Sequence, residues 1–429
     1  MCKDKKVAVV YVLSKRGNPL MPCSPRKARV LLKQSKANVL KRTPFTIQLK
    51  IDTPETTQPI SLGIDSGYSH IGLSAITSNK ELYSADVKLR TDIVKLLSKR
   101  RAYRRARRSR NLWYRKPRFK NRDIPEGWFA PSIRHKLNTH IKMINKVKEI
   151  LPITQINIEV ASFDIQKIKN PDISGVEYQN GPQKNYSNTR EYILHRDNHT
   201  CQNCMGKSKD PILTVVKLQT HHIESRQTGG KRPDNLITLC LTCHDKVTKG
   251  EIELNVKPLK GFKAETFMTK IRWELVDQLK EQFNKVFHTY GYITKQNRKA
   301  LELPKSHTND AFVIAGGTVQ KRLSNYYLIE QVRNCNRKLF KGIRSHIRNT
   351  AERFIQGFQR FDKVSYKDIE CFIFGRRASG YFDLKKLDGS KIHASAKYTD
   401  LTLLERSKTL LIERRMALLP YLKEGVSEP

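Results

Sequence analysis

Short apolar runs of strand length recur along the chain and are separated by polar turns or by longer helical stretches. Residues 59–76 form two such runs around a turn that contains glycine, and residues 155–160 form another. Residues 132–151 have the spacing of an amphipathic helix, and a second, more apolar helix opens at His307. The pattern predicts a mixed α/β fold.

A second pattern lies in the middle of the sequence. Residues 214–223 are typical of a strand, residues 224–235 of a loop, residues 236–240 of another strand and residues 241–249 of a short helix. The expected unit is therefore ββα. After residue 331, short strand-like runs around glycine-containing turns predict a small β-rich region at the carboxyl end.

Two Cys-x-x-Cys pairs enclose the predicted ββα segment. Each pair can turn two sulfurs towards one ion, and four thiolates suit tetrahedral zinc with no open position. A redox role would need only one pair in a different context. We therefore expect a structural zinc site formed by Cys201, Cys204, Cys240 and Cys243.

The segment between these pairs contains imidazole side chains suited to phosphodiester hydrolysis. A histidine at the end of a strand can take a proton from water, while a metal ion held by neighbouring imidazoles stabilises the leaving oxyanion. The segment resembles the HNH nucleases in His221, His222, Asn235 and His244. The resemblance implies that His222 is the general base, that His221 and His244 bind the catalytic metal, and that Asn235 orients the base through the loop backbone.

Acidic residues mark a second candidate site elsewhere in the chain. Asp65 follows a strand, where an aspartate alone is more often a turn residue, and Glu159 interrupts an apolar strand, where an unpaired carboxylate would be costly. His307 and Asp310 share one face of a helical first turn. Asp65, Glu159 and Asp310 together could hold two divalent ions, with His307 accepting a proton.

The net charge limits the choice of partner. The chain has 429 residues, with 82 lysines and arginines against 40 acidic residues, and a formal charge of +42. A duplex of about 20 base pairs carries roughly 40 phosphates, so a nucleic acid of that size could balance this excess. We expect no membrane partner, because the apolar run at residues 7–13 is too short to span a bilayer.

The arginine-rich segment is the densest basic region. Residues 95–122 contain fourteen lysines and arginines, no acidic residue and four interleaved aromatic residues. An isolated run of this kind is often a disordered arm or a localisation signal, but such charge density also favours ordering on RNA. The expected nucleic-acid-binding residues are Arg100, Arg101, Arg104, Arg105, Arg107, Arg108, Arg110, Arg115 and Arg118.

The order of these features resembles one nuclease family. Asp65, Glu159, His307 and Asp310 resemble the split RuvC branch of the RNase H fold, with the HNH segment inserted before the last part, and Pro19-Leu20-Met21-Pro22 resembles the PLMP domain of IscB proteins. The resemblance implies an α/β fold: an RNase H-like (RuvC) mixed sheet with an inserted ββα-metal HNH domain, plus small N-terminal PLMP and C-terminal β-rich domains. The implied ranges are PLMP 1–56, RuvC 57–92, 125–168 and 261–330, bridge helix 93–124, HNH with linkers 169–260, and an RNA- and target-contacting region 331–429.

This resemblance implies an RNA-guided DNA endonuclease. HNH would cut the guide-paired strand and RuvC the displaced strand, with magnesium or manganese at both sites and structural zinc. The expected partners are a structured guide RNA and target double-stranded DNA, bound by a monomeric protein in a 1:1 complex with RNA. Four further cysteines without a disulfide-like framework, Cys2, Cys23, Cys335 and Cys371, favour a reducing compartment, expected to be a prokaryotic cytoplasm.

Two other functions stay open from the residues alone. An unguided homing or junction endonuclease would use both metal sites but would leave the arginine-rich segment without a role. A non-catalytic RNA-binding accessory of a mobile element would use the basic charge but would have no chemical need for the acidic and imidazole residues.

Overall fold

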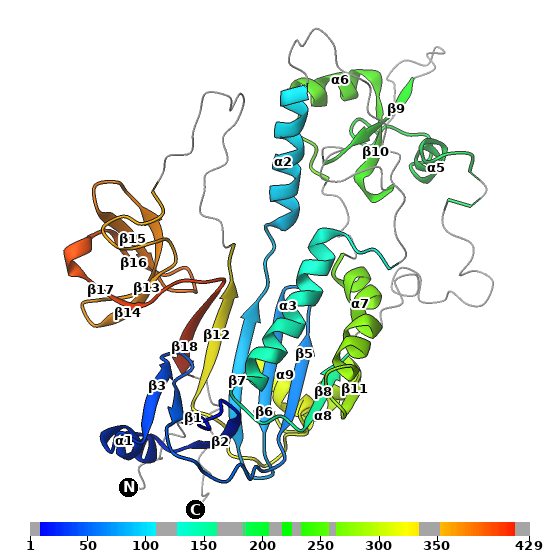
Figure 1. Cartoon of the computed structure of the whole chain (residues 1–429). Helices are drawn as coiled ribbons and strands as arrows, with labels where there is room; N and C mark the ends of the chain where they lie inside the picture. The colour runs from blue at the N-terminus through cyan, green and yellow to red at the C-terminus, as the bar shows by residue number, and fades with distance from the viewer. Residues whose placement is uncertain are drawn as a thin grey trace, which may run out of the picture. The chain divides into compact units, whose positions relative to one another are not determined.

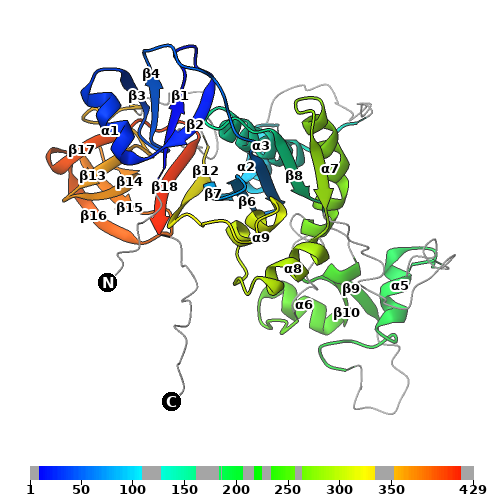
Figure 2. The same cartoon turned by 90° about the horizontal axis from the view of Figure 1, so that it is seen from below.

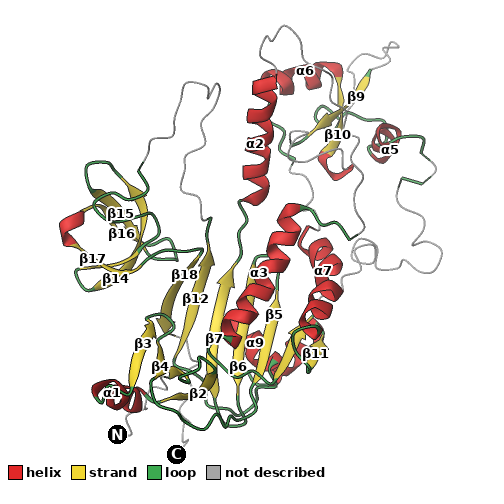
Figure 3. Ribbon diagram, viewed as in Figure 1, coloured by secondary structure: helices red, strands yellow, loops and turns green. Residues whose placement is uncertain are grey.

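The computed structural model of the chain describes residues 9–108, 127–160, 183–184, 186–205, 217–224, 233–256, 263–333 and 352–416. Within these ranges, only the backbone is described for residues 106–108 and 263–266. The chain forms two compact units. One combines Met1–Ser162 with Phe267–Pro429, and the other is Phe163–Thr266 (Figures 1 and 3). The second unit contains the range 169–260 that the sequence assigns to an HNH domain and its linkers.

A seven-stranded mixed sheet forms the centre of the first unit, in the order β11-β8-β5-β6-β7-β12-β18. β6 runs antiparallel to both of its neighbours, β5 and β7. β8 runs parallel to β5, and β11 runs parallel to β8. β12 is parallel to β7 and antiparallel to β18. The strands are β5 (Ser61–Ser66), β6 (His70–Ile76), β7 (Glu81–Lys88), β8 (Gln155–Glu159), β11 (Val286–Thr289), β12 (Asn325–Gln331) and β18 (Leu410–Met416).

Helices cover both faces of this sheet. Figures 1 and 2 show α3 (Pro131–Lys148) and α7 (Lys263–Lys280) over one face, and α8 (Gly291–Ala300) and α9 (His307–Ile314) over the other. The main core lies between the first pair and the sheet, where apolar residues of α3 meet Leu62 and Ile64 of β5. The predicted amphipathic helix at 132–151 corresponds to α3, which begins at a proline in its first turn, a position where proline is well tolerated.

The opposite face of the sheet carries two glycines where α9 approaches. A Cβ atom built on Gly63 of β5 would lie 2.0 Å from the carbonyl oxygen of Ala311, and one on Gly72 of β6 would lie 2.0 Å from the carbonyl oxygen of His307. Any larger residue at either position would therefore push the helix away. The two glycines set α9 directly against the end of β5.

The amino-terminal part forms its own sheet, in the order β2-β1-β4-β3. The predicted Pro19-Leu20-Met21-Pro22 motif lies in β2, and the early apolar run forms β1, whose Tyr11 hydroxyl donates a hydrogen bond of 3.0 Å to the carbonyl oxygen of Leu82. The elements are β1 (Val10–Leu13), β2 (Pro19–Cys23), α1 (Pro25–Lys33), β3 (Ala37–Lys41) and β4 (Thr46–Leu49).

The carboxyl-terminal part forms a five-stranded antiparallel sheet, in the order β16-β15-β14-β13-β17. Its core includes Val364, Ile373 and Phe382. The chain then returns to the central sheet, because β18 pairs with β12. The elements are β13 (Lys363–Tyr366), β14 (Ile369–Arg376), β15 (Tyr381–Lys385), β16 (Lys391–Lys397), η3 (Tyr398–Asp400) and β17 (Leu401–Glu405).

The second unit contains a hairpin and helices. β9 and β10 pair antiparallel, and β10 and α6 have the bounds that the sequence predicts. The strand expected from residue 214 is described from Leu218 onwards, and residues 214–216 lie outside the described residues. The elements are α5 (Thr189–Arg196), β9 (Leu218–His222), η2 (Pro233–Asn235), β10 (Leu236–Cys240) and α6 (Leu241–Lys249).

The basic segment is described only in its first part. Helix α2 (Ile93–Arg108) contains the start of the predicted bridge helix, and the remainder of the 93–124 range lies outside the described residues. None of the helices within the described ranges is long and apolar enough to cross a membrane.

Candidate functional sites

Two carboxylates lie at the carboxyl ends of neighbouring parallel strands. β5 and β8 are in register at Ile64 and Ile158, so Asp65 and Glu159 come next on the two strands and project to the same face. The Ser66 hydroxyl donates a hydrogen bond of 2.5 Å to the carbonyl oxygen of Glu159, which ties the two strand ends together. Asp65 is only 9% exposed.

Helix α9 brings the other two predicted residues to this edge. Ser306 caps the helix, since its hydroxyl accepts a hydrogen bond from the backbone amide of Asn309. In the first turn, Nδ1 of His307 lies 2.7 Å from Oδ2 of Asp65. Asp310, three residues further on, is close enough for its charge to interact with that of Asp65. The structure therefore brings Asp65, Glu159, His307 and Asp310 together from three separate parts of the chain.

The site concentrates negative charge in a poorly solvated place. Burial raises the pKa of Glu159 to about 7; a hydrogen bond from Thr294 opposes this increase, and the charge of Asp65 adds to it. Burial, followed by the charge of Asp65, also raises the pKa of Asp310. A buried cluster of this kind is stabilised by cations, and carboxylate oxygens are the ligands that magnesium and manganese prefer.

His307 interacts directly with one of these carboxylates, that of Asp65. Its hydrogen bond to Asp65 raises the pKa of the imidazole, although burial acts in the opposite direction. Its side chain is 43% exposed, whereas that of Asp65 is 12% exposed. The ring is thus the accessible member of the pair and can exchange a proton with solvent or with a bound molecule.

Several residues of this site were not expected from the sequence. The ring of His70 stacks on that of His307 at 5.0 Å between centroids and 5° between planes, and Nδ1 of His70 lies 2.9 Å from Oδ1 of Asp86. Nε of Arg298 lies 2.7 Å from Oδ1 of Asp310, in a geometry in which neither atom makes a hydrogen bond. His70 lies five residues after Asp65, but nothing in that spacing indicates a ring-on-ring contact with a residue of α9.

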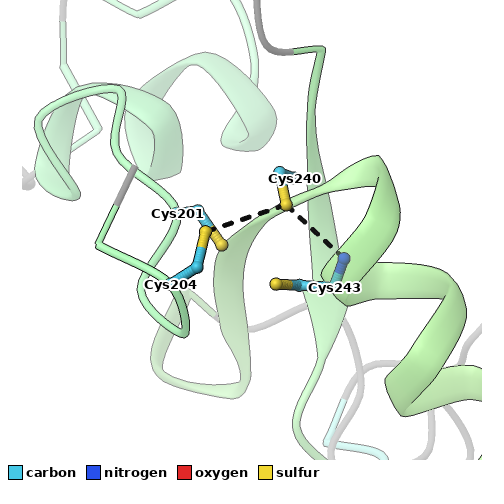
Figure 4. A group of neighbouring side chains, drawn as sticks. All are labelled: Cys201, Cys204, Cys240 and Cys243. Atoms are coloured by element: carbon cyan, nitrogen blue, oxygen red, sulfur yellow. Dashed lines mark hydrogen bonds between the residues drawn. The ribbon is translucent and has the colours of Figure 1, made fainter. Parts of the chain in front are cut away.

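The four cysteines form a second, separate cluster (Figure 4). Their sulfurs all lie within 4.8 Å of one another. Within the described part of the chain, this is the group of three or more histidine, cysteine or acidic side chains whose ligand atoms lie that close together. Cys201, Cys240 and Cys243 are buried and Cys204 is exposed. Such a set of four sulfurs fits structural zinc, as the spacing predicts.

Cys201 and Cys243 of this cluster differ in how readily their thiols ionise. For Cys201, burial opposes ionisation, but hydrogen bonds from backbone amides, beginning with that of Cys204, lower the pKa to about 7. For Cys243, burial raises the pKa to about 12. A bound cation would favour the thiolate at every position, because a metal-binding thiol is deprotonated.

The histidines lie on the hairpin beside this cluster. His221 and His222 end β9, His244 lies in α6, and the rings of His221 and His244 meet edge to face at 5.0 Å between centroids. Burial lowers the pKa of His221, and the charges of His244 and His222 act in the same direction, which favours the neutral ring, whose lone pair can bind a metal.

Asn235 and His222 are held differently. The Asn235 side chain accepts a hydrogen bond of 2.8 Å from the Glu224 amide and donates one of 3.0 Å to the Glu224 carbonyl oxygen, so it fixes the backbone just after the histidines. Nε2 of His222 is buried and makes no hydrogen bond. An unsatisfied buried nitrogen of this kind is often explained by a catalytic role or by a water or ion.

The predicted nucleic-acid-binding arginines are only partly described. Arg100, Arg101, Arg104 and Arg105 are exposed on α2. Arg107 and Arg108 lie in the last turn of the same helix, and their side chains are outside the description. Arg110, Arg115 and Arg118 lie outside the described residues.

Family comparisons match two segments of the chain. Residues 10–181 match the RRXRR protein family, and residues 201–250 match the HNH endonuclease family. The first match contains Asp65, the arginine-rich segment and Glu159, and the second contains the four zinc-site cysteines and all four predicted HNH residues. The chain therefore resembles the RRXRR protein family in its first part and the HNH endonuclease family over residues 201–250, which confirms the expected resemblance of that segment to the HNH nucleases.

Comparison with solved structures gives weaker likenesses. Streptococcus thermophilus Cas9 in complex with AGGA PAM is 15% identical, with a TM-score of 0.31, over 44% of this chain and 26% of that one. The same protein in complex with the AGAA PAM is 13% identical, with a TM-score of 0.30, over the same shares. The chain thus matches about a quarter of the length of these structures. Comparison with curated proteins gives no match.

Proposed function

We propose that the protein is an RNA-guided DNA endonuclease of the IscB type, with two separate cutting sites. The observation that carries this proposal is the convergence of Asp65, Glu159 and Asp310 at one edge of the central sheet, in a unit whose sequence is interrupted by the HNH domain. An HNH domain alone would fit many nucleases. A second acidic centre in the same chain supports a protein that cuts both strands of a duplex.

The central sheet supports assignment of the first unit to the RuvC branch of the RNase H fold. Asp65 and Glu159 leave adjacent strands, and His307 and Asp310 approach from α9. Asp65, Glu159 and Asp310 would hold magnesium or manganese, which would stabilise the negative charge that develops on the scissile phosphate. His307, as the accessible base, would accept a proton from the attacking water.

The HNH unit would act on the other strand. His221 and His244 would hold its divalent ion, since their rings meet and burial favours the neutral ring of His221. His222 would accept a proton from water, and Asn235 would hold it in place through the Glu224 backbone. The four cysteines would fix the hairpin to α6 through zinc, with no part in the chemistry.

Guide RNA is the partner that the charge and the RRXRR match favour. The four exposed arginines described on α2 offer bidentate contacts to phosphates. In the proposed reaction, pairing between guide and target selects the sequence, HNH cuts the guide-paired strand and the RuvC site cuts the displaced strand.

Strand-resolved cleavage tests this proposal. With RNA recovered from the purified complex and a matching duplex labelled on both strands, Asp65→Ala is expected to cut only the guide-paired strand. His222→Ala is expected to cut only the displaced strand. Either loss should reach at least about a hundredfold, because catalytic carboxylates and bases commonly contribute that much.

The same assay separates the competing functions. Cleavage without RNA would favour an unguided homing or junction endonuclease. Absence of metal-dependent cleavage with the cognate RNA would favour a non-catalytic RNA-binding accessory. Double-strand cutting at full rate by either single variant would contradict the assignment of one strand to each site.

A further inference from the structure

Four aromatic side chains form a continuous row that none of the chemistry above uses. Trp273 of α7 meets His288 of β11 at 5.4 Å between ring centroids, and His288 meets Tyr290 at 5.7 Å. Tyr290 and Tyr292 lie 6.1 Å apart with their planes within 7° of parallel. We call Trp273, His288, Tyr290 and Tyr292 the aromatic row.

The ends of the row are open to solvent. Trp273 is 45% exposed and Tyr292 is 70% exposed. Tyr292 is the second residue of a helix, where many polar residues would serve as well for folding. Fold stability therefore accounts for Tyr290, which packs against the main core, but not for the exposed tyrosine beside it.

The backbone at one end of the row passes close to Glu159. Thr289 pairs with Glu159 in the sheet, so the chain passes directly from β11 beside this carboxylate into Tyr290. Gly291 stands between the two tyrosines, and a Cβ atom built on it would lie 3.1 Å from Oε1 of Glu159. The rings of His288 and Tyr290 project to the opposite face of the sheet from Glu159, and Gly291 brings the chain back to this carboxylate directly before Tyr292.

The charge around the row suits a polyanion. The segment from Lys285 to Ala300 contains four basic residues and no acidic one, and Lys285, Lys295 and Lys299 are exposed. At the other end of the row, the guanidinium carbon of Arg272 lies 5.6 Å from the centre of the Trp273 ring. α7 adds Glu274 and Asp277, so the basic character belongs to the β11–α8 end.

We propose that the aromatic row is a stacking surface for unpaired bases of single-stranded DNA, and that it holds this strand while its backbone enters the carboxylate site. This inference rests on the proposed function, in which the displaced strand is the substrate of that site. Buried carboxylates repel phosphates until they hold cations, so an attraction to the strand that does not depend on bound cations would help to place it there. Base stacking on aromatic rings supplies it without regard to sequence, as a guided nuclease requires.

A substitution at the most exposed ring tests the proposal in the full RNA-bound complex. Tyr292→Leu keeps an apolar side chain but removes the ring, and it is expected to slow cleavage of the displaced strand about tenfold, within the range of one lost base stack. Tyr292→Phe restores the ring and is expected to cut this strand faster than Tyr292→Leu. Cleavage of the guide-paired strand by HNH in the same reaction reports folding and guide loading.

Val319→Ala is the matched control, because Val319 is an apolar residue of the same unit that is 92% exposed and lies outside both proposed sites. It is expected to cut both strands at the unaltered rate. Equal displaced-strand rates for Tyr292→Leu, Tyr292→Phe and the unaltered protein would overturn the proposal. A similar loss on both strands would overturn it as well, since the effect would then not belong to the displaced strand.

Photocrosslinking tests the contact in the unaltered protein. With 5-iododeoxyuridine placed along the displaced strand, crosslinked peptides are expected to contain Trp273 or Tyr292. Crosslinks that map only elsewhere, or a row that crosslinks to guide RNA instead, would overturn the proposal. Asp65→Ala separates failure of the proposed function from failure of the stacking proposal. If Asp65→Ala still cuts the displaced strand, the proposed function is wrong. If only the expected effects of the Tyr292 variants are absent, the stacking role of the aromatic row is wrong and the proposed function stands.

Discussion

At the scale of single residues, Glu159 connects the structure of the site to its chemistry. Burial raises the pKa of this carboxyl to about 7, with further contributions from two neighbouring carboxylates. The folded chain thus binds a proton here more tightly than the unfolded chain does, so stability falls as pH rises towards this pKa. A bound divalent cation would offset that loss by favouring the ionised form.

This pKa predicts the pH dependence of displaced-strand cleavage. Below about pH 7 a growing fraction of Glu159 is protonated, so the rate is expected to fall with falling pH, approaching about tenfold per pH unit well below the midpoint. Raising the magnesium concentration should move the midpoint to lower pH, because proton and cation compete for one carboxylate. Rates measured between about pH 5.5 and 8 at several magnesium concentrations check both statements.

Glu159→Gln is the matched variant, since it keeps the shape of the side chain and cannot titrate. It is expected to abolish displaced-strand cleavage without altering the pH profile of the guide-paired strand. A displaced-strand profile in the unaltered protein that is flat over this range, or whose midpoint ignores magnesium, would contradict the role given to this residue.

At the scale of elements, the site depends on how closely α9 approaches the sheet. Gly63 and Gly72 leave no side chain between the helix and the strands, and Gly72 pairs directly with Asp65 across β5 and β6. The helix therefore delivers His307 to within hydrogen-bond distance of Asp65. A displacement of α9 by a fraction of the helix radius would break that contact.

Gly72→Ala tests this dependence. Its Cβ atom would lie 2.0 Å from the carbonyl oxygen of His307, so the helix or the strand must move. Overpacking of this kind typically costs about 1–3 kcal/mol, and loss of displaced-strand cleavage by at least tenfold is expected while the HNH unit still nicks the other strand. Thermal unfolding and strand-resolved rates measure the two effects. Full activity on the displaced strand would show that α9 does not need this close approach.

Local elements were largely predictable from the sequence, because their signals are local. The bounds of β10 and α6 follow from an apolar run and the spacing after it, and the strand containing Glu159 follows from a short apolar run. The four zinc-site cysteines follow from spacing within two tight turns. The N-cap Ser306 and the first turn of α9 place His307 and Asp310 on one face before any tertiary contact is considered.

Contacts between distant segments were not predictable. The stacking of His70 on His307 and the approach of Arg298 to Asp310 depend on the packing of β6, α8 and α9, which leaves no pattern in the sequence. The return of β18 to the central sheet was also missed, since even the nearest paired residues of the two strands, Leu410 and Gln331, are 79 positions apart in the sequence. The aromatic row was missed for the same reason, because Trp273 meets the other rings only through tertiary packing.

At the scale of the whole molecule, the chain consists of two units that each carry a different kind of candidate site. One presents buried carboxylates at the edge of a sheet, and the other presents histidines on a hairpin beside four cysteines. Neither candidate metal site explains the formal charge of +42, because the metal-binding residues are acidic, imidazole or thiol side chains. The proposed nucleic-acid partner would account for this charge, and affinity for that partner should fall steeply with salt.

The most direct test of the account is the position of bound manganese. In crystals of the protein soaked in manganese chloride, anomalous scattering is expected to place manganese against the carboxylates of Asp65 and Glu159, and the signal there should vanish in Asp65→Ala. Zinc anomalous scattering at Cys201, Cys204, Cys240 and Cys243 provides an internal reference for ordered metal. Ordered zinc together with no manganese between Asp65, Glu159 and Asp310 would contradict the claim that these side chains form one cation site.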